Sequence, residues 1–266
     1  MATRQFVAGD KILEETPIIK GRTSEFKSLQ WVKLAVANLL PTNREFFYQL
    51  QNSFPEKEEV GIMETNCYGL GCDNALSGVF EVFSRINHSC IPNAERWWDL
   101  EREVETLYAI HDIKENEEIT VAYSGDVYYR PLSDRQDLIS RGWRFHCLCR
   151  CCQLTDPESV AASDRRRRFI GWVDKEVGFR APHKMIQLVT RALEFIEEEG
   201  IVGVIKARLC YDGYQLALEI KNLEQAKRFI KMAYEQYLLA TGPTSEQTTK
   251  MLRYVRNPKS HMAWGL

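Results

Sequence analysis

The part of this sequence that decides the fold is Arg85-Ile86-Asn87-His88-Ser89-Cys90-Ile91-Pro92-Asn93, which reads R-x-N-H-S-C-x-P-N. It brings two amides, an imidazole and a thiol into one short stretch. Taken singly, Asn87 and Asn93 would be turn residues, and His88 would be a buried histidine of the core. The combination at this spacing indicates a functional site rather than a turn.

A second motif lies downstream, at residues 117–123, and reads E-E-I-T-V-A-Y. Its alternating pattern predicts a strand over residues 118–123, with Ile119, Val121 and Tyr123 on one face. The preceding Glu115-Asn116 pair predicts a turn, because asparagine tolerates the left-handed conformation.

A third motif is the cysteine cluster at residues 147–152, in which Cys147, Cys149 and Cys152 form C-x-C-x2-C. Thiolates at this spacing favour Zn²⁺, which takes four tetrahedral ligands. A closed site of four ligands has no position for water or substrate, so the zinc would be structural. A fourth ligand remote in sequence is preferred, because adjacent cysteines rarely face one ion. The candidates are Cys67, Cys72, Cys90, His146, Cys151 and Cys210.

The composition of the chain excludes several classes of protein. Hydrophobic residues make up 44% and charged residues 27% of the 266 residues, as in ordinary globular domains. The net charge of −2 and the lack of finger-like Cys/His spacing argue against a zinc-binding DNA module. No apolar run is long enough to span a bilayer, and the N-terminus lacks the apolar segment of a secretory signal. We therefore expect an intracellular protein with reduced thiols.

Helical periodicity separates the chain into regions. Strands are predicted over residues 11–19, 94–98 and 105–110. Helices are predicted between the first two of these strands and after residue 152. The predicted helices cover residues 26–40, a short segment from residue 42 or 43, and residues 185–196, 204–220, 223–239 and about 245–257. A boundary is expected in residues 155–168, which end in four arginines. Those arginines indicate a solvated helix start or linker, or alternatively a nuclear localisation signal.

Together, the three motifs resemble in order and spacing the SET domain of protein-lysine methyltransferases. The resemblance covers about residues 1–152 and is greatest for the SET and MYND group, in its MYND-less fungal form. Arg135-Gln136 before the cysteines and Cys210-Tyr211-Asp212-x-Tyr214 in the helical tail support this assignment. Residues 21–61 contain no cysteine, so the MYND zinc module is missing.

The resemblance implies an α+β fold with three parts. A SET-domain β-fold would cover residues 1–125, with a helical insertion at about residues 24–60. A post-SET zinc-binding segment would cover residues 126–153. An all-α region would follow at residues 165–266, in which the helix pair around Lys221-Asn222 is similar to a tetratricopeptide-type hairpin. The alternative for this last region is a helical cap packed on the first domain.

The resemblance also implies the residues of a site. Tyr123 would be the active-site tyrosine and would line the channel of the target lysine together with Trp143. S-adenosylmethionine would be bound by Asn66, Asn87, His88 and Phe145. Zinc would be held by Cys90 as the remote fourth ligand, with Cys147, Cys149 and Cys152.

The implied function is S-adenosylmethionine-dependent methylation of a lysine in a histone or non-histone protein, in the nucleus or cytoplasm. A protein partner is possible on the helical region, and neither nucleic acid nor membrane is expected as a partner. SET domains begin with a strand that carries G-x-G, whereas this sequence begins with Met1-Ala2-Thr3-Arg4-Gln5-Phe6, which aligns just after that motif. Glycine is needed there because a side chain would collide with the cofactor. The alternative is therefore a catalytically impaired SET-like scaffold that acts as a protein-interaction module.

Overall fold

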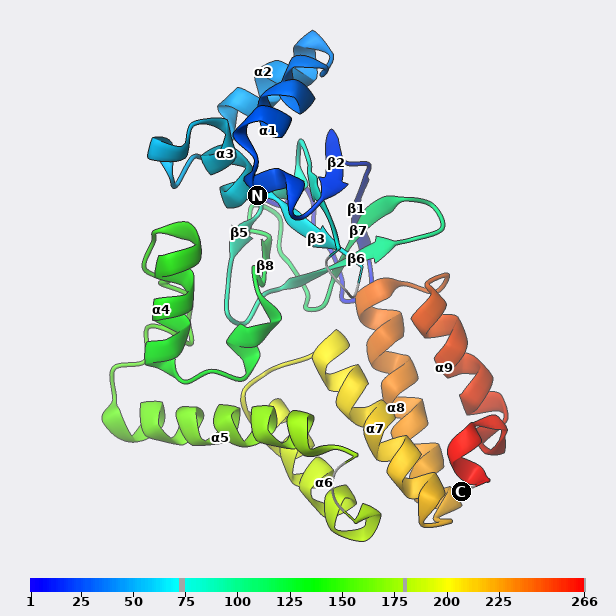
Figure 1. Cartoon of the computed structure of the whole chain (residues 1–266). Helices are drawn as coiled ribbons and strands as arrows, with labels where there is room; N and C mark the ends of the chain where they lie inside the picture. The colour runs from blue at the N-terminus through cyan, green and yellow to red at the C-terminus, as the bar shows by residue number, and fades with distance from the viewer. Residues whose placement is uncertain (72–74, 179–180, 266) are drawn as a thin grey trace.

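The strands form three small sheets between two groups of helices (Figure 1). The computed structural model describes residues 1–71, 75–178 and 181–265. Two sheets are antiparallel, with strand orders β1-β7-β6 and β2-β4-β3, and β5 pairs with β8 in parallel. The strands are β1 (Lys11–Glu15), β2 (Ile19–Arg22), β3 (Tyr68–Leu70), β4 (Leu76–Val79), β5 (Asn87–His88), β6 (Ala94–Asp99), β7 (Val104–Ala109) and β8 (Thr120–Val121).

The hairpin of β6 and β7 confirms the two strands predicted from residues 94–98 and 105–110. All six residues of β7 are buried, because β7 lies between β1 and β6 and is covered on both faces. Burial includes Glu105, whose carboxylate pairs with Arg96 at 3.0 Å. The Arg96 guanidinium partly offsets the cost of burying this charge, although the second carboxylate oxygen of Glu105 has no hydrogen-bond partner within the described residues.

The first group of helices follows β2 and forms a lobe above the sheets (Figure 1). The predicted helix over residues 26–40 is instead a 3-10 turn followed by α1, because Ser28 accepts a hydrogen bond from the Trp31 N–H and starts a new helix. Helix α1 already ends at Ala37, and Pro41 is the first residue of α2, where its missing N–H leaves no helical hydrogen bond unmade. The elements are η1 (Glu25–Lys27), α1 (Leu29–Ala37), α2 (Pro41–Gln49), η2 (Pro55–Lys57) and α3 (Glu59–Asn66).

The second group of helices confirms the helices that the apolar periodicity predicted in the C-terminal half. Asn116, Gly200 and Lys221 have positive φ angles at the expected turns. No helix within the described ranges is long and apolar enough to cross a membrane. The elements are η3 (Phe83–Arg85), η4 (Gly125–Tyr128), α4 (Leu132–Trp143), α5 (Pro157–Glu176), α6 (Pro182–Glu198), α7 (Val204–Glu219), α8 (Leu223–Thr241), α9 (Glu246–Arg256), η5 (Pro258–Ser260) and η6 (Met262–Trp264).

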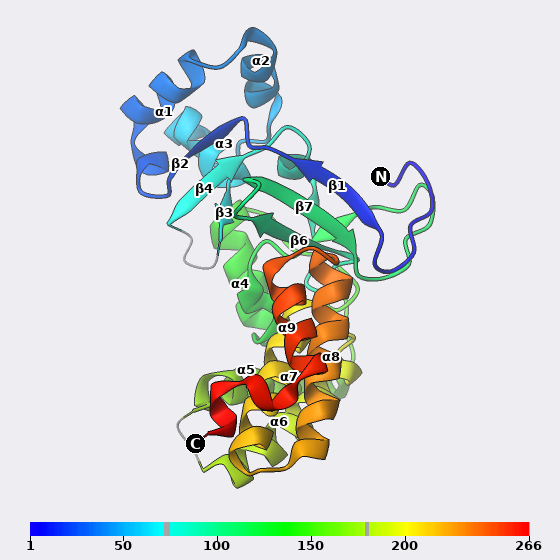
Figure 2. The same ribbon diagram turned by 90° about the vertical axis from the view of Figure 1, so that its right-hand side faces the viewer.

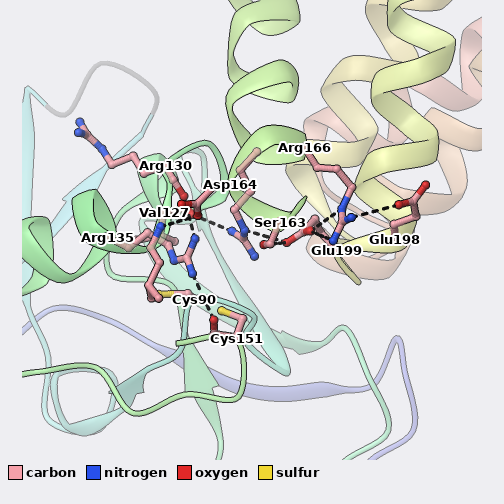
Figure 3. A network of polar contacts seen from close by, with 12 residues as sticks. Cys90, Val127, Arg130, Arg135, Cys151, Ser163, Asp164, Arg166, Glu198 and Glu199 are labelled. Carbon is pink, nitrogen blue, oxygen red and sulfur yellow. Dashed lines mark hydrogen bonds and ion pairs between the residues drawn. The ribbon is translucent and has the colours of Figure 1, made fainter. Parts of the chain in front are cut away.

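In the stretch expected to contain a boundary, residues 157–168 form the first part of α5, in agreement with the predicted helix start. Asp156 caps this helix by accepting a hydrogen bond from the Ser159 N–H. Arg167 is fully buried, donates to the Val127 carbonyl at 2.9 Å and pairs with Glu199 at 2.9 Å. Figure 3 shows Glu199 beside Ser163 and Arg166 in this network. The run of four arginines is therefore partly structural rather than a uniformly solvated basic segment.

Helices α7, α8 and α9 pack beneath the β6–β7 hairpin (Figure 2). Two glycines with positive φ make this approach possible. At Gly203, an added Cβ would lie 1.9 Å from the Glu95 carboxylate, and at Gly242 it would lie 2.1 Å from the Tyr108 hydroxyl. Glu95 instead accepts a hydrogen bond from the Val204 N–H at 3.0 Å, at the start of α7. The helical region is thus attached to the sheet at specific backbone positions.

Candidate active site and cysteine cluster

The first two sequence motifs meet where β5 pairs with β8, with His88 opposite Val121. Asn93 cross-links the same two segments. Its side chain donates to the Glu118 carbonyl at 2.8 Å and accepts from the Thr120 N–H at 2.9 Å. An asparagine is suited to this position because one side-chain amide both donates and accepts.

Tyr123 follows β8 directly and is held at both ends. Its backbone N–H donates to His88 Nδ1 at 3.1 Å, and its hydroxyl donates to the Ile86 carbonyl at 2.9 Å. Burial raises the pKa of Tyr123 to about 12, so the hydroxyl stays protonated at neutral pH. Burial lowers the pKa of His88 to about 4, so the imidazole is neutral and carries its proton on Nε2.

Four aromatic rings surround this point. The ring of Tyr123 lies 5.0 Å from Trp143, 5.2 Å from His88 and 6.4 Å from Phe145, measured between centroids. Trp143 is fixed by a hydrogen bond from its Nε1 to the Thr65 carbonyl at 3.2 Å. Phe145 keeps 37% of its surface exposed, so it offers an apolar face on which a flat ring could stack. The structure therefore brings together four residues that the sequence predicted for one site.

The two predicted asparagines differ in their surroundings. Asn87 is exposed, and its amide donates to the Glu118 carboxylate at 2.6 Å, which fixes its orientation. Asn66 is buried at the end of α3, where its amide donates to the carbonyls of Gln51 at 2.6 Å and Ile62 at 2.7 Å. Both amide protons of Asn66 hold the helical insertion together, so only its oxygen remains for a ligand.

Two hollows reach the segment around Tyr123. One, of about 650 Å³, is lined by Tyr123, Ser124 and Trp143 together with α4. The other, of about 600 Å³, is lined by β6, by Val121 and Ala122, and by the start of α9. A transfer between two bound molecules needs two such approaches to one point.

The third motif folds onto the first. The Cys90 sulfur lies 3.6 Å from that of Cys152 and 4.0 Å from that of Cys147, and the Cys149 and Cys151 sulfurs lie 3.5 Å apart. Zn–S bonds of about 2.3 Å at tetrahedral angles place sulfurs about 3.8 Å apart. The cysteine cluster, defined as these five residues, therefore fits a zinc ion.

The other sequence candidates for the fourth ligand lie elsewhere. Cys67 packs against the core of the helical insertion, and Cys210 is buried among the C-terminal helices. Cys72 lies outside the described residues. His146 is exposed, whereas the neutral His88 imidazole donates from Nε2 to the Cys90 sulfur at 3.2 Å. This contact links the cysteine cluster to Tyr123, since His88 Nδ1 accepts the Tyr123 N–H.

Sequence reasoning missed several residues that shape the site. Glu118 orients Asn87, and its place within the E-E-I-T-V-A-Y motif was the signal that could have found it. Cys151 joins the cysteine cluster although an adjacent cysteine was disfavoured there. Arg135 donates to the Cys151 carbonyl at 3.3 Å and is fully buried (Figure 3), a role for which its sequence gives no sign.

Comparison with known proteins identifies the first part of the chain. Residues 1–124 match the model of the SET domain. This part of the chain is a SET domain. Across 256 residues the chain is 26% identical to the histone-lysine N-methyltransferase set5 of Schizosaccharomyces pombe, an alignment that covers 95% of this chain and 78% of that protein.

Other relatives match a smaller part of the chain. The chain is 31% identical over 140 residues to the protein-lysine N-trimethyltransferase SMYD5 of Mus musculus, covering 51% of this chain and 32% of that protein. It is 25% identical over 127 residues to the human N-lysine methyltransferase SMYD2, covering 45% of this chain and 28% of that protein. The SET-domain chain described here thus spans about a third of the length of these two relatives.

Proposed function

We propose that this SET-domain protein transfers a methyl group from S-adenosylmethionine to a lysine of a protein substrate. The observation that carries the proposal is the arrangement around Tyr123. A protonated phenol, a neutral imidazole and two further aromatic rings converge there from the first two sequence motifs and from the segment just before the cysteines. S-adenosylmethionine, when bound, supplies a methyl group on a positively charged sulfonium.

The residues around Tyr123 are suited to the lysine, which is the second reactant. A free lysine has a pKa of about 10.4, so its amine must lose a proton before it can attack. The apolar walls of Tyr123 and Trp143 disfavour the charged ammonium. The Tyr123 hydroxyl, held by the Ile86 carbonyl, orients the neutral amine without acting as a base, because its own pKa is raised. Most of the rate gain then comes from positioning in a water-poor channel.

The cofactor is assigned to the side of Asn87, His88 and Phe145, with Asn66 contributing its remaining oxygen. The partly exposed face of Phe145 suits the adenine ring, and Asn87 is pre-oriented by Glu118. We assign the hollow lined by Tyr123 and Trp143 to the target lysine, and the hollow beside β6 to a neighbouring part of the protein substrate. The carboxylates of Glu101 and Glu246 are exposed at this second hollow and attract positively charged residues of the substrate.

We assign a structural zinc ion to Cys90, Cys147, Cys149 and Cys152. The Cys90 sulfur lies at this spacing from the sulfurs of Cys147 and Cys152, and four thiolates leave no open coordination position. The zinc would join the loop that carries Asn87 and His88 to the segment that carries Phe145. It therefore holds the cofactor side of the site together and takes no part in the transfer.

The C-terminal helices form the proposed surface for a protein partner. Consecutive helices from α5 to α9 pack against one another in chain order, as in tetratricopeptide-like arrays. The family resemblance supports a location in the nucleus or cytoplasm, where such a substrate would be met.

The function is tested by methyl transfer from labelled S-adenosylmethionine to histones and to a mixture of cellular proteins. The expected label is on lysine, identified by mass spectrometry. The matched control is the same substrate with its lysines chemically acetylated, which should take up no label. Cofactor binding without transfer to any lysine would contradict the enzyme and favour the scaffold.

A further inference from the structure

The cysteine cluster contains one more sulfur than a zinc ion needs. A tetrahedral zinc takes four ligands, and five cysteines converge here. With Cys90, Cys147, Cys149 and Cys152 as ligands, Cys151 remains. Its sulfur lies 3.5 Å from that of Cys149, within the group whose ligand atoms are all within 4.8 Å of one another.

The surplus sulfur is more accessible than the sulfurs at the centre of the cluster. Cys90 and Cys147 are fully buried, whereas Cys149, Cys151 and Cys152 are partly exposed. A small oxidant in solution therefore meets these three sulfurs before it meets those of Cys90 and Cys147, and Cys149 and Cys151 are the pair among them with sulfurs 3.5 Å apart.

Two buried arginines stand beside this cluster with unused hydrogen-bond donors. Arg135 is 1% exposed and Arg167 is 0% exposed, and the Nε of Arg135 and the Nη2 of Arg167 have no hydrogen-bond partner within the described residues. Arg135 donates to the Cys151 carbonyl and faces the Cys152 sulfur (Figure 3). Such buried positive charges fit a centre that carries negative charge on its sulfurs. The hydrogen bond from Arg135 to the Cys151 carbonyl also fixes the turn that carries Cys151.

We propose that Cys151 is an oxidation site for hydrogen peroxide, and that a Cys149–Cys151 disulfide releases the zinc ion. The inference rests on the zinc site of the proposed function. Peroxide transfers one oxygen to the Cys151 thiol, which becomes a sulfenic acid, and one water leaves. The Cys149 thiolate attacks that sulfur, an S–S bond forms, and hydroxide leaves and takes up a proton as the second water.

The step balances without any other reagent. Each of the two sulfurs loses one electron, and the peroxide gains both. Zinc loses Cys149 as a ligand and dissociates. Cys90 then no longer ties the His88 loop to the segment that carries Phe145, so oxidation opens the cofactor side of the site. A thiol reductant with added zinc reverses the change.

The test follows zinc release from the zinc-loaded full chain with a coloured chelator during treatment with hydrogen peroxide. Cys151→Ser is the test variant, since the Arg135 contact is to a backbone carbonyl and survives the substitution. Cys67→Ser is the matched control, because Cys67 lies outside the cluster. We expect one zinc per chain in all three proteins, with peroxide-driven release about tenfold slower in Cys151→Ser alone.

Two results would overturn the proposal. Loss of zinc from untreated Cys151→Ser would make Cys151 a ligand, and release at the wild-type rate would make the ligands themselves the target. Mass spectrometry of the oxidised wild-type protein gives an answer that does not depend on any variant. A Cys149–Cys151 linkage is expected, and any other pairing contradicts the mechanism. Neither readout uses methyl transfer, so failure of the enzyme activity would be seen separately.

Discussion

Replacing Glu95 by glutamine tests the attachment of the helical region to the sheet. Glu95 lies on β6 and accepts the Val204 N–H at the start of α7. Burial raises its pKa from 4.5 to about 7, only partly offset by that hydrogen bond and by Arg96. Two tyrosines, Tyr128 and Tyr237, also interact with this carboxylate. The folded protein therefore favours the neutral acid, which glutamine imitates.

The sign and the size of the effect follow from the two pKa values. A group whose pKa is raised by folding stabilises the protein fully below its unfolded value and loses that contribution as pH rises through its folded value. Glu95 should thus lower the free energy of unfolding between about pH 4.5 and 7. A difference of about 2.5 pKa units corresponds to about 3 kcal/mol, at roughly 1.4 kcal/mol per unit.

The assay is urea unfolding, followed by tryptophan fluorescence at a series of pH values. Glu95→Gln should match the wild type near pH 4.5 and exceed its stability by up to about 3 kcal/mol at pH 8. Glu101→Gln is the matched control, because Glu101 is an exposed carboxylate at the end of the same hairpin, and it should change stability by less than about 0.5 kcal/mol. A constant difference in the free energy of unfolding between Glu95→Gln and the wild type over the whole pH range would refute the reasoning.

Three further substitutions test other parts of the account. Tyr123→Phe should lower methyl transfer about a hundredfold while thermal unfolding stays unchanged, and an unaltered rate would remove this hydroxyl from the mechanism. Cys90→Ser should weaken zinc binding, measured by competition with a chelator; wild-type affinity would assign the fourth position to another cysteine. Arg167→Met should destabilise the protein by about 3 kcal/mol in urea unfolding, because buried Glu199 loses a partner, whereas Arg165→Met at an exposed position should have little effect.

The sequence pattern predicted those helices and turns whose formation depends on residues close together in the chain. Helices α6 to α9 follow from a regular apolar stripe, and the turn at Asn116 follows from the tolerance of asparagine for positive φ. The site residues His88, Tyr123, Trp143 and Phe145 were found because their motifs have a fixed order and spacing. The structure places their rings together.

The parts that were missed depend on contacts between distant residues. Helix α3 has no apolar stripe, since it is buried on several sides and includes Gly61 and Asn66 among its buried residues. Arg167 is buried only because Glu199, far along the chain, supplies the opposite charge. The strand predicted over residues 118–123 is shorter, because the Tyr123 N–H bonds to the His88 side chain rather than to a neighbouring strand.

Calorimetric titration of the zinc-loaded chain with S-adenosylmethionine tests the central claim most directly, because every assigned role depends on that binding. Asn87→Ala is the test variant, since Asn87 is exposed and its loss leaves the core intact. The account predicts binding in the micromolar range for the wild type and its loss in Asn87→Ala. No measurable heat with the wild type, or equal affinity in both proteins, would contradict it.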